Sequence, residues 1–101
     1  MRIEVTAKHV ELTDAIRQYA DTKCARLPRF YDGVQSIQVL IVRPQKREEF
    51  EIEIRADVEK HDDFVAKERG HDIYGCIDLC VDKLARQLAD FKERLKNSKR
   101  A

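Results

Sequence analysis

The chain has 101 residues, with 20 Lys or Arg against 19 Asp or Glu, three cysteines and no tryptophan. This length fits one domain that folds without a metal or a disulfide, and no apolar run approaches the roughly 20 residues of a membrane span. Three cysteines without framework spacing predict reduced thiols, and the N-terminus reads as a strand rather than a signal peptide. We therefore expect a cytoplasmic protein and exclude a membrane protein and a disulfide-stapled secreted domain.

The first elements predicted along the chain are a strand and a helix. Ile3, Val5 and Ala7 alternate with polar residues, which is typical of a strand with one buried face. Thr13 is a suitable N-cap for a helix that we expect to stop at Pro28. The apolar positions of this helix follow a spacing of three and four, at Ile16, Tyr19, Ala20, Cys24 and Leu27.

Three further strands are predicted between residues 34 and 69. Segment 34–43 is rich in β-branched residues and ends at Pro44. In segment 49–59 apolar residues alternate with charged ones, so one face should be core and the other wet and acidic. After a turn at 60–63, segment 64–69 forms a last short strand before Gly70.

The longest predicted element is a C-terminal helix that begins after the capping residue Asp72. Its large apolar residues recur at intervals of three and four, so they form one stripe. The element order is then β-α-β-β-β-α, an α+β fold. Because a strand-helix-strand unit is normally a right-handed crossover, both helices should pack on one face of a mixed four-stranded sheet. The stripe consists of Tyr74, Ile77, Val81, Leu84, Leu88, Phe91 and Leu95.

The charges are separated along the chain although their total is close to zero. Residues 82–101 hold seven Lys or Arg against three carboxylates, a net charge of +4. Residues 44–63 hold four cations against eight carboxylates, a net charge of −4. Such asymmetry bears on partners rather than on fold.

Three separated segments resemble one known family. They read IEVTAKHVELT at 3–13, KCARLPRFY at 23–31, and DIYGCID followed by DKLARQL at 72–88. The resemblance is to the short form of the ribosome hibernation promoting factors, the ribosome-associated translation inhibitors also called sigma-54 modulation proteins. It covers nearly the whole chain.

The resemblance implies a fold similar to double-stranded-RNA-binding domains, with one ribosome-binding domain over residues 1–97 and a short basic tail over 98–101. It also implies a stress or stationary-phase factor that binds the small ribosomal subunit and its rRNA at the mRNA and tRNA channel, inhibits translation and stabilises inactive ribosomes. Other hibernation factors would be further partners. It implies no enzyme activity, no cofactor, no metal, no membrane and no small-molecule substrate.

The family's basic positions fall on cations of both helices, whose role would be to contact rRNA phosphates. Arg94 and Lys99 would extend this set, whereas Asp90, Phe91 and Glu93 interrupt it. The seven matching residues are Lys23, Arg26, Arg29, Lys83, Arg86, Lys92 and Lys96.

Other interpretations of the same residues remain open. Cations on an amphipathic helix are also typical of a plain solvated face. The chain could be a generic duplex-RNA binder, or a regulatory module that binds proteins through the acidic strand. Phe30 and Tyr31 could stack on bases, although packing is more usual for such a pair. The acidic positions are Glu49, Glu51, Glu53, Asp57 and Glu59.

A metal site is the weakest alternative. Cys76 and Cys80 lie one helical turn apart with His71 nearby, but no fourth ligand stands close in sequence. Both cysteines flank the apolar stripe, so we expect buried thiols there and at Cys24.

Overall fold

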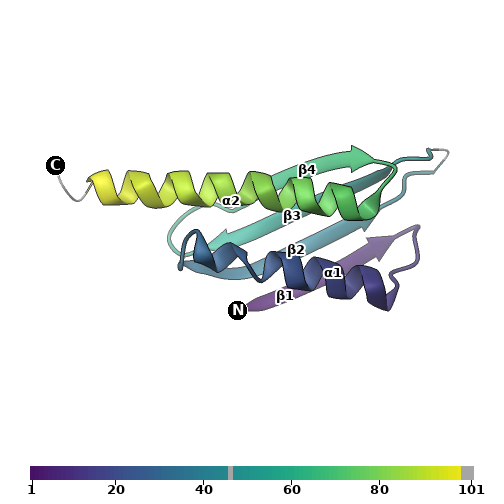
Figure 1. Ribbon diagram of the computed structural model, residues 1–101, viewed down its shortest axis with the longest axis horizontal. Helices are drawn as coiled ribbons and strands as arrows, with labels where there is room; N and C mark the ends of the chain where they lie inside the picture. Colours follow the sequence, from purple (N-terminus) through teal and green to yellow (C-terminus); the bar gives the residue numbers. More distant parts are fainter. Residues whose placement is uncertain (46, 99–101) are drawn as a thin grey trace.

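The computed structural model describes residues 1–45 and 47–98. The elements follow the predicted order β-α-β-β-β-α, with one additional short 3-10 helix, η1 (Figure 1). They are β1 (Arg2–Lys8), α1 (Asp14–Cys24), η1 (Leu27–Arg29), β2 (Val34–Val42), β3 (Phe50–Val58), β4 (Phe64–Gly70) and α2 (Ile73–Ser98). Residues 99–101, which make up most of the predicted tail and include Lys99, lie outside the described residues.

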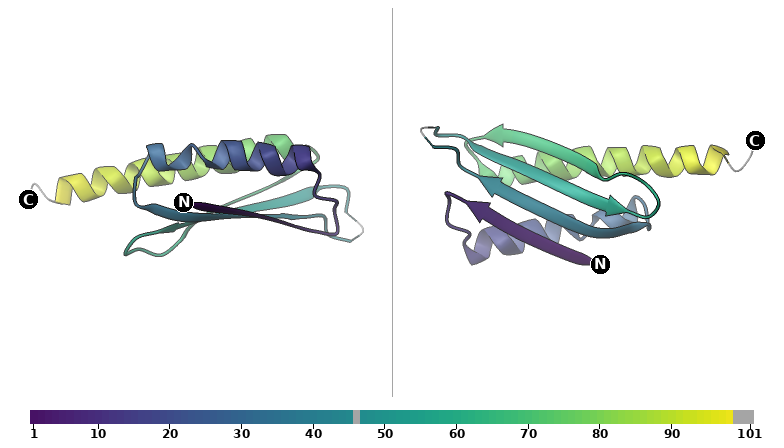
Figure 2. Two further views of the ribbon diagram at one scale, coloured as in Figure 1. Left: turned by 90° about the horizontal axis from the view of Figure 1, so that it is seen from below. Right: turned by 180° about the vertical axis from the view of Figure 1, so that it is seen from behind.

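The strands form one mixed sheet in the order β1-β2-β3-β4. β1 pairs with β2 in parallel, and the other two pairs are antiparallel. Both helices lie on the same face of this sheet, and the other face is uncovered (Figure 2). The predicted fold class and the common helical layer are therefore confirmed.

The core lies between the sheet and this helical layer. Alternate residues of the central strands point inward and are almost fully buried, among them Ile37, Val39, Ile52 and Ile54. They pack with one side of α2, from Ile73 to Leu88, and with α1 and the turn that follows it. Burial of this apolar surface is the main driving force for the fold. No buried side-chain nitrogen or oxygen of the described residues lacks a hydrogen-bond partner.

Two helix starts are capped as the sequence predicts. The Oγ1 of Thr13 accepts a hydrogen bond from the Ile16 backbone N–H at 3.2 Å. Asp72 does the same for Tyr74, whose N–H lies 3.1 Å from Oδ1. Each cap satisfies one of the backbone donors that the first helical turn leaves unpaired.

The predicted end of the first helix is wrong by one turn. α1 ends at Cys24, and Pro28 lies inside η1 rather than at the helix end. A proline lacks the backbone N–H that a continuing helix needs, but a first-turn position requires none. The chain therefore uses Pro28 to start a second, tighter turn, which carries Leu27 into the core.

The stripe predicted for the long helix is buried only in its middle. Ile77, Val81, Leu84 and Leu88 are buried, whereas the side chains of Tyr74 and Leu95 are 39% and 37% exposed. α2 has 26 residues and extends well past the sheet, so its last turns have no strand beneath them (Figure 1).

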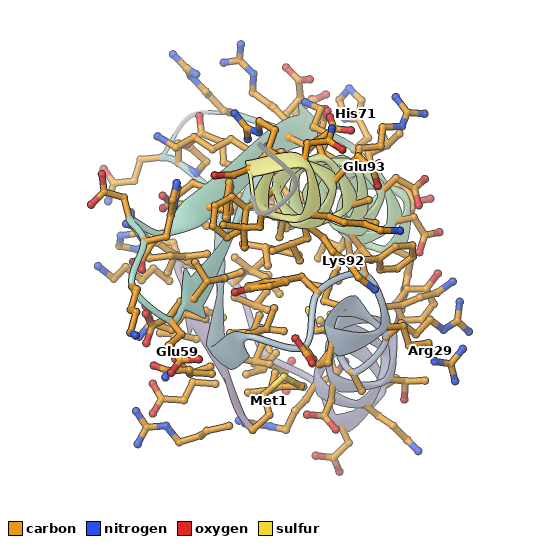
Figure 3. The ribbon with its side chains drawn as sticks, turned by 90° about the vertical axis from the view of Figure 1, so that its left-hand side faces the viewer. Met1, Arg29, Glu59, His71, Lys92 and Glu93 are labelled. Atoms are coloured by element: carbon orange, nitrogen blue, oxygen red, sulfur yellow. The ribbon has the colours of Figure 1, made fainter. Side chains whose placement is uncertain are left out.

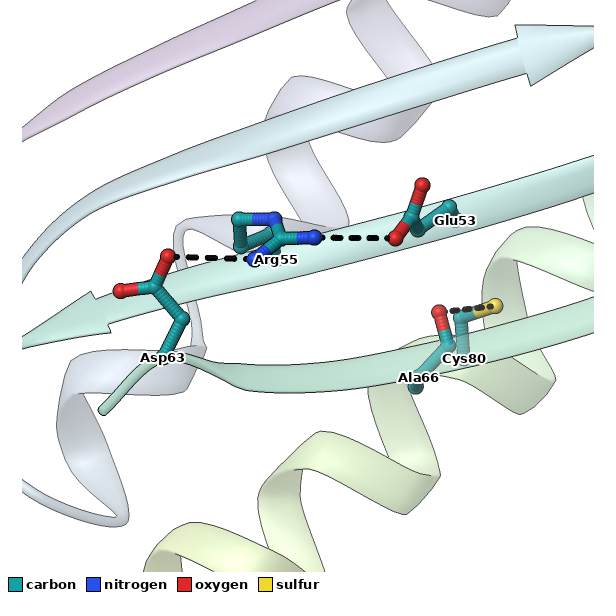
Figure 4. Close-up of polar contacts among 5 residues, drawn as sticks. All are labelled: Glu53, Arg55, Asp63, Ala66 and Cys80. Carbon is teal, nitrogen blue, oxygen red and sulfur yellow. Dashed lines mark hydrogen bonds and ion pairs between the residues drawn. The ribbon is translucent and has the colours of Figure 1, made fainter.

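The uncovered face of the sheet is not the acidic surface that the sequence predicts. The pairing of β3 with β4 places Glu51 opposite Arg69 and Glu53 opposite Lys67. Arg55 also forms ion pairs with Glu53 at 3.3 Å and with Asp63 at 3.4 Å (Figure 4). The carboxylates of β3 are thus interleaved with cations, because the neighbouring strand supplies charges that the pattern of one strand does not reveal.

Candidate nucleic-acid interface

The end of α1 lies beside the first half of α2, and Lys23 joins the two helices. Its Nζ lies 3.5 Å from the Asp78 carboxylate and 5.4 Å from the centre of the Tyr19 ring. The Tyr19 hydroxyl donates a hydrogen bond to the same carboxylate, at 2.7 Å, and this bond raises the pKa of Tyr19. Lys23 is thus partly neutralised before any ligand arrives.

η1 turns the next cations and one aromatic ring outward. Arg26 and Arg29 are exposed at its two ends. Tyr31 turns inward, with its ring edge-on to Phe91 of α2 at a centroid distance of 5.2 Å. Phe30 remains 39% exposed. The packing expected for the aromatic pair is confirmed for Tyr31 but wrong for Phe30, because consecutive residues in this turn point in different directions.

A hollow of about 290 Å³ separates the end of α1 from α2. Cationic and aromatic side chains line one wall, and carboxylates and small apolar side chains of α2 line the other. The lining residues are Lys23, Arg26, Phe30, Asp78, Val81, Asp82 and Ala85.

The cations of α2 do not form one surface. Lys83 and Lys92 are nine residues apart, which is about two and a half helical turns, so they lie on opposite sides of the helix. Lys83 faces β4, where it pairs with Glu68 and donates a hydrogen bond to the Lys67 carbonyl oxygen at 3.3 Å.

Lys92 and Lys96 project from the opposite, α1-facing side of the helix. Figure 3 shows Lys92 above the turn that carries Arg29. Lys96 follows one turn later on the same side, where α2 extends past the sheet.

Five of the seven predicted cations therefore remain available to a polyanion. Among the described residues these five make no ion pair within 4.0 Å, and each has an exposed side chain. Their positions flank the hollow and continue along the free end of α2. We call these residues the helical cations: Arg26, Arg29, Arg86, Lys92 and Lys96.

Lys83 has a structural partner that sequence reasoning missed. One turn after it, Gln87 donates a hydrogen bond to the Val65 carbonyl oxygen at 3.4 Å. Val65 and Lys67 are alternate residues of β4, the edge strand of the sheet. Exposed backbone carbonyls on an edge strand can pair with a strand of another molecule, which promotes aggregation. The spacing of four residues places Lys83 and Gln87 on the same side of α2. Only the fold shows that both side chains donate hydrogen bonds to backbone carbonyls of the edge strand β4.

Phe91 belongs to the predicted apolar stripe, but its aromatic partners could not be predicted from the sequence, where it also interrupts the basic run. Its ring packs against Tyr31, against His61 at 4.5 Å and against Phe64 at 5.4 Å between centroids. His61 in turn stacks on Phe64 at 4.7 Å. This aromatic cluster fixes the second half of α2 above the β3–β4 turn and thereby positions Lys92.

The three cysteines are buried thiols, as predicted. Burial raises the pKa of Cys24 and of Cys80 to about 12, and it also raises the pKa of Cys76. The Cys80 Sγ lies 3.7 Å from the backbone carbonyl oxygens of both Ile52 and Ala66, so its single S–H can donate to either one. Figure 4 shows the contact with Ala66. Neutral thiols of this kind are poor nucleophiles and poor metal ligands.

The remaining chemistry of the described residues is sparse. Within residues 1–45 and 47–98 no three His, Cys, Asp or Glu side chains are placed to hold a metal ion. In the same part of the chain, none of the helices combines the length and the apolar composition that a membrane crossing requires.

Fold and charge placement together define an α+β domain with a mixed four-stranded sheet and free cations on its helical layer. Comparison with known proteins identifies the family. The chain belongs to the Sigma 54 modulation protein / S30EA ribosomal protein family, whose model matches residues 3–96. The family predicted from the three segments is therefore confirmed.

Named relatives match over almost the whole chain. The ribosome hibernation promoting factor of Escherichia coli (strain K12) is 32% identical over 99 residues, which cover 95% of this chain and 98% of that protein. The factor of the same name from Azotobacter vinelandii is also 32% identical, over 94 residues that cover 93% of this chain and 85% of the relative.

Solved structures share the fold. The N-terminal domain of Protein Y from Thermus thermophilus superposes with a TM-score of 0.79 at 34% identity, over 90% of this chain and 99% of that domain. A ribosomal subunit interface protein from Coxiella burnetii gives a TM-score of 0.81 at 22% identity, over 92% and 99%. The second likeness supports the fold alone.

Proposed function

We propose that this protein is a ribosome hibernation factor that binds the small subunit through its helical layer. Its membership of a family whose relatives are named ribosome hibernation promoting factors supports the ribosome as the target. The observation that carries the choice of surface is the placement of the helical cations, which are exposed on one layer of the molecule and form no ion pair within the described part of the chain. The opposite sheet face has cations and carboxylates interleaved.

Binding through such a surface is a matter of phosphate contacts. Each guanidinium or ammonium that meets a phosphate releases condensed counterions, so affinity falls as salt rises. Side chains on a rigid helical layer can follow the backbone of folded RNA without reading its bases. The proposed contacts are with rRNA at the mRNA and tRNA channel, and inhibition follows from occupancy of that channel. No catalytic turnover is required.

Within this proposal the seven predicted residues have unequal roles. Arg26, Arg29 and Lys92 form the centre of the phosphate-binding surface, and Arg86 and Lys96 extend it. Lys23 and Lys83 are already paired with Asp78 and Glu68, so their contacts with RNA are secondary.

The test is co-sedimentation of purified protein with small subunits, large subunits and whole ribosomes over a range of salt concentrations. We expect recovery with small subunits and whole ribosomes, and none with isolated large subunits. Log affinity should fall linearly with log salt, and each phosphate contact removed should reduce the slope by roughly 0.7 to 0.9. Exclusive recovery with large subunits would refute the proposal.

A matched pair of variants tests the surface itself. The double variant Arg26→Glu, Arg29→Glu changes the helical layer, and Arg2→Glu, Lys8→Glu changes β1 by the same net charge. All four side chains are exposed. We expect the first variant to lose small-subunit binding and translation inhibition together, and the second to retain both. The reverse result would place the interface on the sheet.

A further inference from the structure

The exposed ring of Phe30 lines the hollow between the helices, and phosphate binding does not use it. Two neighbouring side chains of the same turn pack inward: Tyr31 packs on Phe91, and Leu27 is fully buried in the core. Phe30 instead stands 39% exposed in the wall of the hollow between α1 and α2. Single exposed apolar residues are common on protein surfaces, so a functional role for Phe30 must be argued from the residues around it.

The surroundings of Phe30 combine three chemistries within one hollow. Arg26 supplies a free guanidinium on the same wall. Val81 and Ala85 of α2 supply small apolar contacts opposite. Asp82 supplies a carboxylate that makes no ion pair within 4.0 Å among the described residues. The other carboxylate, Asp78, is already engaged by Lys23 and Tyr19.

This set fits a nucleotide better than it fits a peptide. A flat base can stack on the Phe30 ring and rest on the small apolar side chains, and such stacking tolerates any base. The guanidinium of Arg26 suits a phosphate, to which it can donate two parallel hydrogen bonds. A free carboxylate only accepts hydrogen bonds, so Asp82 suits the amino or imino N–H groups of a base or the ribose 2′-hydroxyl. The carboxylate of an acidic peptide could also pair with Arg26, but it offers neither a ring to stack on Phe30 nor an N–H donor for Asp82.

We propose that the hollow between α1 and α2 binds one unpaired RNA nucleotide, with Phe30 stacked on its base, Asp82 accepting a hydrogen bond from it, and Arg26 on its phosphate. The proposal rests on the function proposed above and adds a specific contact to it. It gives an otherwise sequence-tolerant phosphate surface one fixed point on the RNA.

Substitutions at Phe30 separate stacking from simple apolar contact. Phe30→Ala and Phe30→Leu remove the aromatic face, while Phe30→Tyr and Phe30→Trp keep it. We expect the first two to weaken small-subunit binding by about 5- to 150-fold, the range for loss of one stacked base, and the other two to bind like the wild type. The salt slope should not change in any of the four, because no ion contact is lost. Arg26→Ala, in contrast, should make the slope shallower.

Asp82 gives a test in which two explanations predict opposite signs. If the carboxylate only repels phosphates, Asp82→Ala strengthens binding. If it accepts a hydrogen bond from the bound nucleotide, the same change weakens binding. We expect weaker binding, and stronger binding would overturn this part of the proposal.

The control and the readouts keep the two proposals distinguishable. Leu79 of α2 is 51% exposed and lies outside the hollow, so Leu79→Ala should bind like the wild type. Chemical probing of small-subunit RNA should reveal a base that the wild type and Phe30→Trp protect and Phe30→Leu does not. Failure of the wild type to bind small subunits would refute the proposed function. Normal wild-type binding with less than a twofold effect of Phe30→Ala, and no such base, would refute only the nucleotide site.

Discussion

Replacement of Phe91 by alanine should destabilise the fold far more than the same change one turn later. Phe91 is half-buried and contacts the rings of Tyr31, His61 and Phe64. Alanine in place of a fully buried phenylalanine costs about 3 to 5 kcal/mol. Since this ring is only partly buried, we expect a smaller loss, about 2 kcal/mol, in the free energy of unfolding. For a domain of this size, that lowers Tm by about 8 to 16 °C.

Leu95 is the matched control for this prediction, because it belongs to the same sequence stripe. Its side chain is 37% exposed and lies beyond the end of the sheet. Leu95→Ala should cost about 0.5 kcal/mol or less, since leucine and alanine have similar helix propensities. Urea unfolding followed by circular dichroism measures both, and the m-values should match that of the wild type. Equal losses for the two variants would refute the claim that the aromatic cluster anchors the second half of α2.

Three other predictions concern stability. Folding keeps Cys24 and Cys80 protonated up to about pH 12, whereas the unfolded chain ionises its thiols near pH 9, so stability should fall as pH rises from 9 to 12. The double variant Cys24→Ala, Cys80→Ala should show a smaller decrease in the free energy of unfolding between pH 9 and 12, measured by urea unfolding. Lys83→Glu places a carboxylate against Glu68 and should cost about 1 kcal/mol in the same assay, whereas Arg86→Glu should stay within about 0.5 kcal/mol. Thr13→Ala removes the helix cap and should lower the free energy of unfolding by about 1 kcal/mol, measured likewise.

The spacing of apolar residues in the sequence predicted the two layers of this fold correctly, because residues are buried at regular intervals along its strands and helices. The alternation in β3 and the three-and-four spacing in α2 both report contact with one continuous core. The same patterns did not predict where contact ends, and Tyr74 and Leu95 continue the stripe without being buried. Periodicity records which side of an element is apolar, whereas the length of the opposing layer decides how much of that side is covered.

The acidic sheet face was predicted wrongly for a related reason. Alternation within β3 correctly placed Glu51 and Glu53 on the uncovered face. Their electrostatic environment, however, depends on the register with β4, which brings Lys67 and Arg69 opposite them. Cross-strand register couples residues that are far apart in sequence, so the charge of a face cannot be deduced from one strand.

The cations of α2 represent a different case, because part of their arrangement was available from the sequence. A separation of nine residues puts Lys83 and Lys92 on opposite sides of any α-helix, so one flat partner cannot contact both in the same way. The sequence did not show which residues of the rest of the chain lie next to each of these two lysines. Lys83 meets the carboxylate and the open edge of β4, whereas Lys92 meets the turn that carries Arg29. A cation that completes the fold and a cation that remains free for a partner are thus distinguished by what the rest of the chain places beside them, and this distinction is why the proposed interface is centred on the gap between the helices.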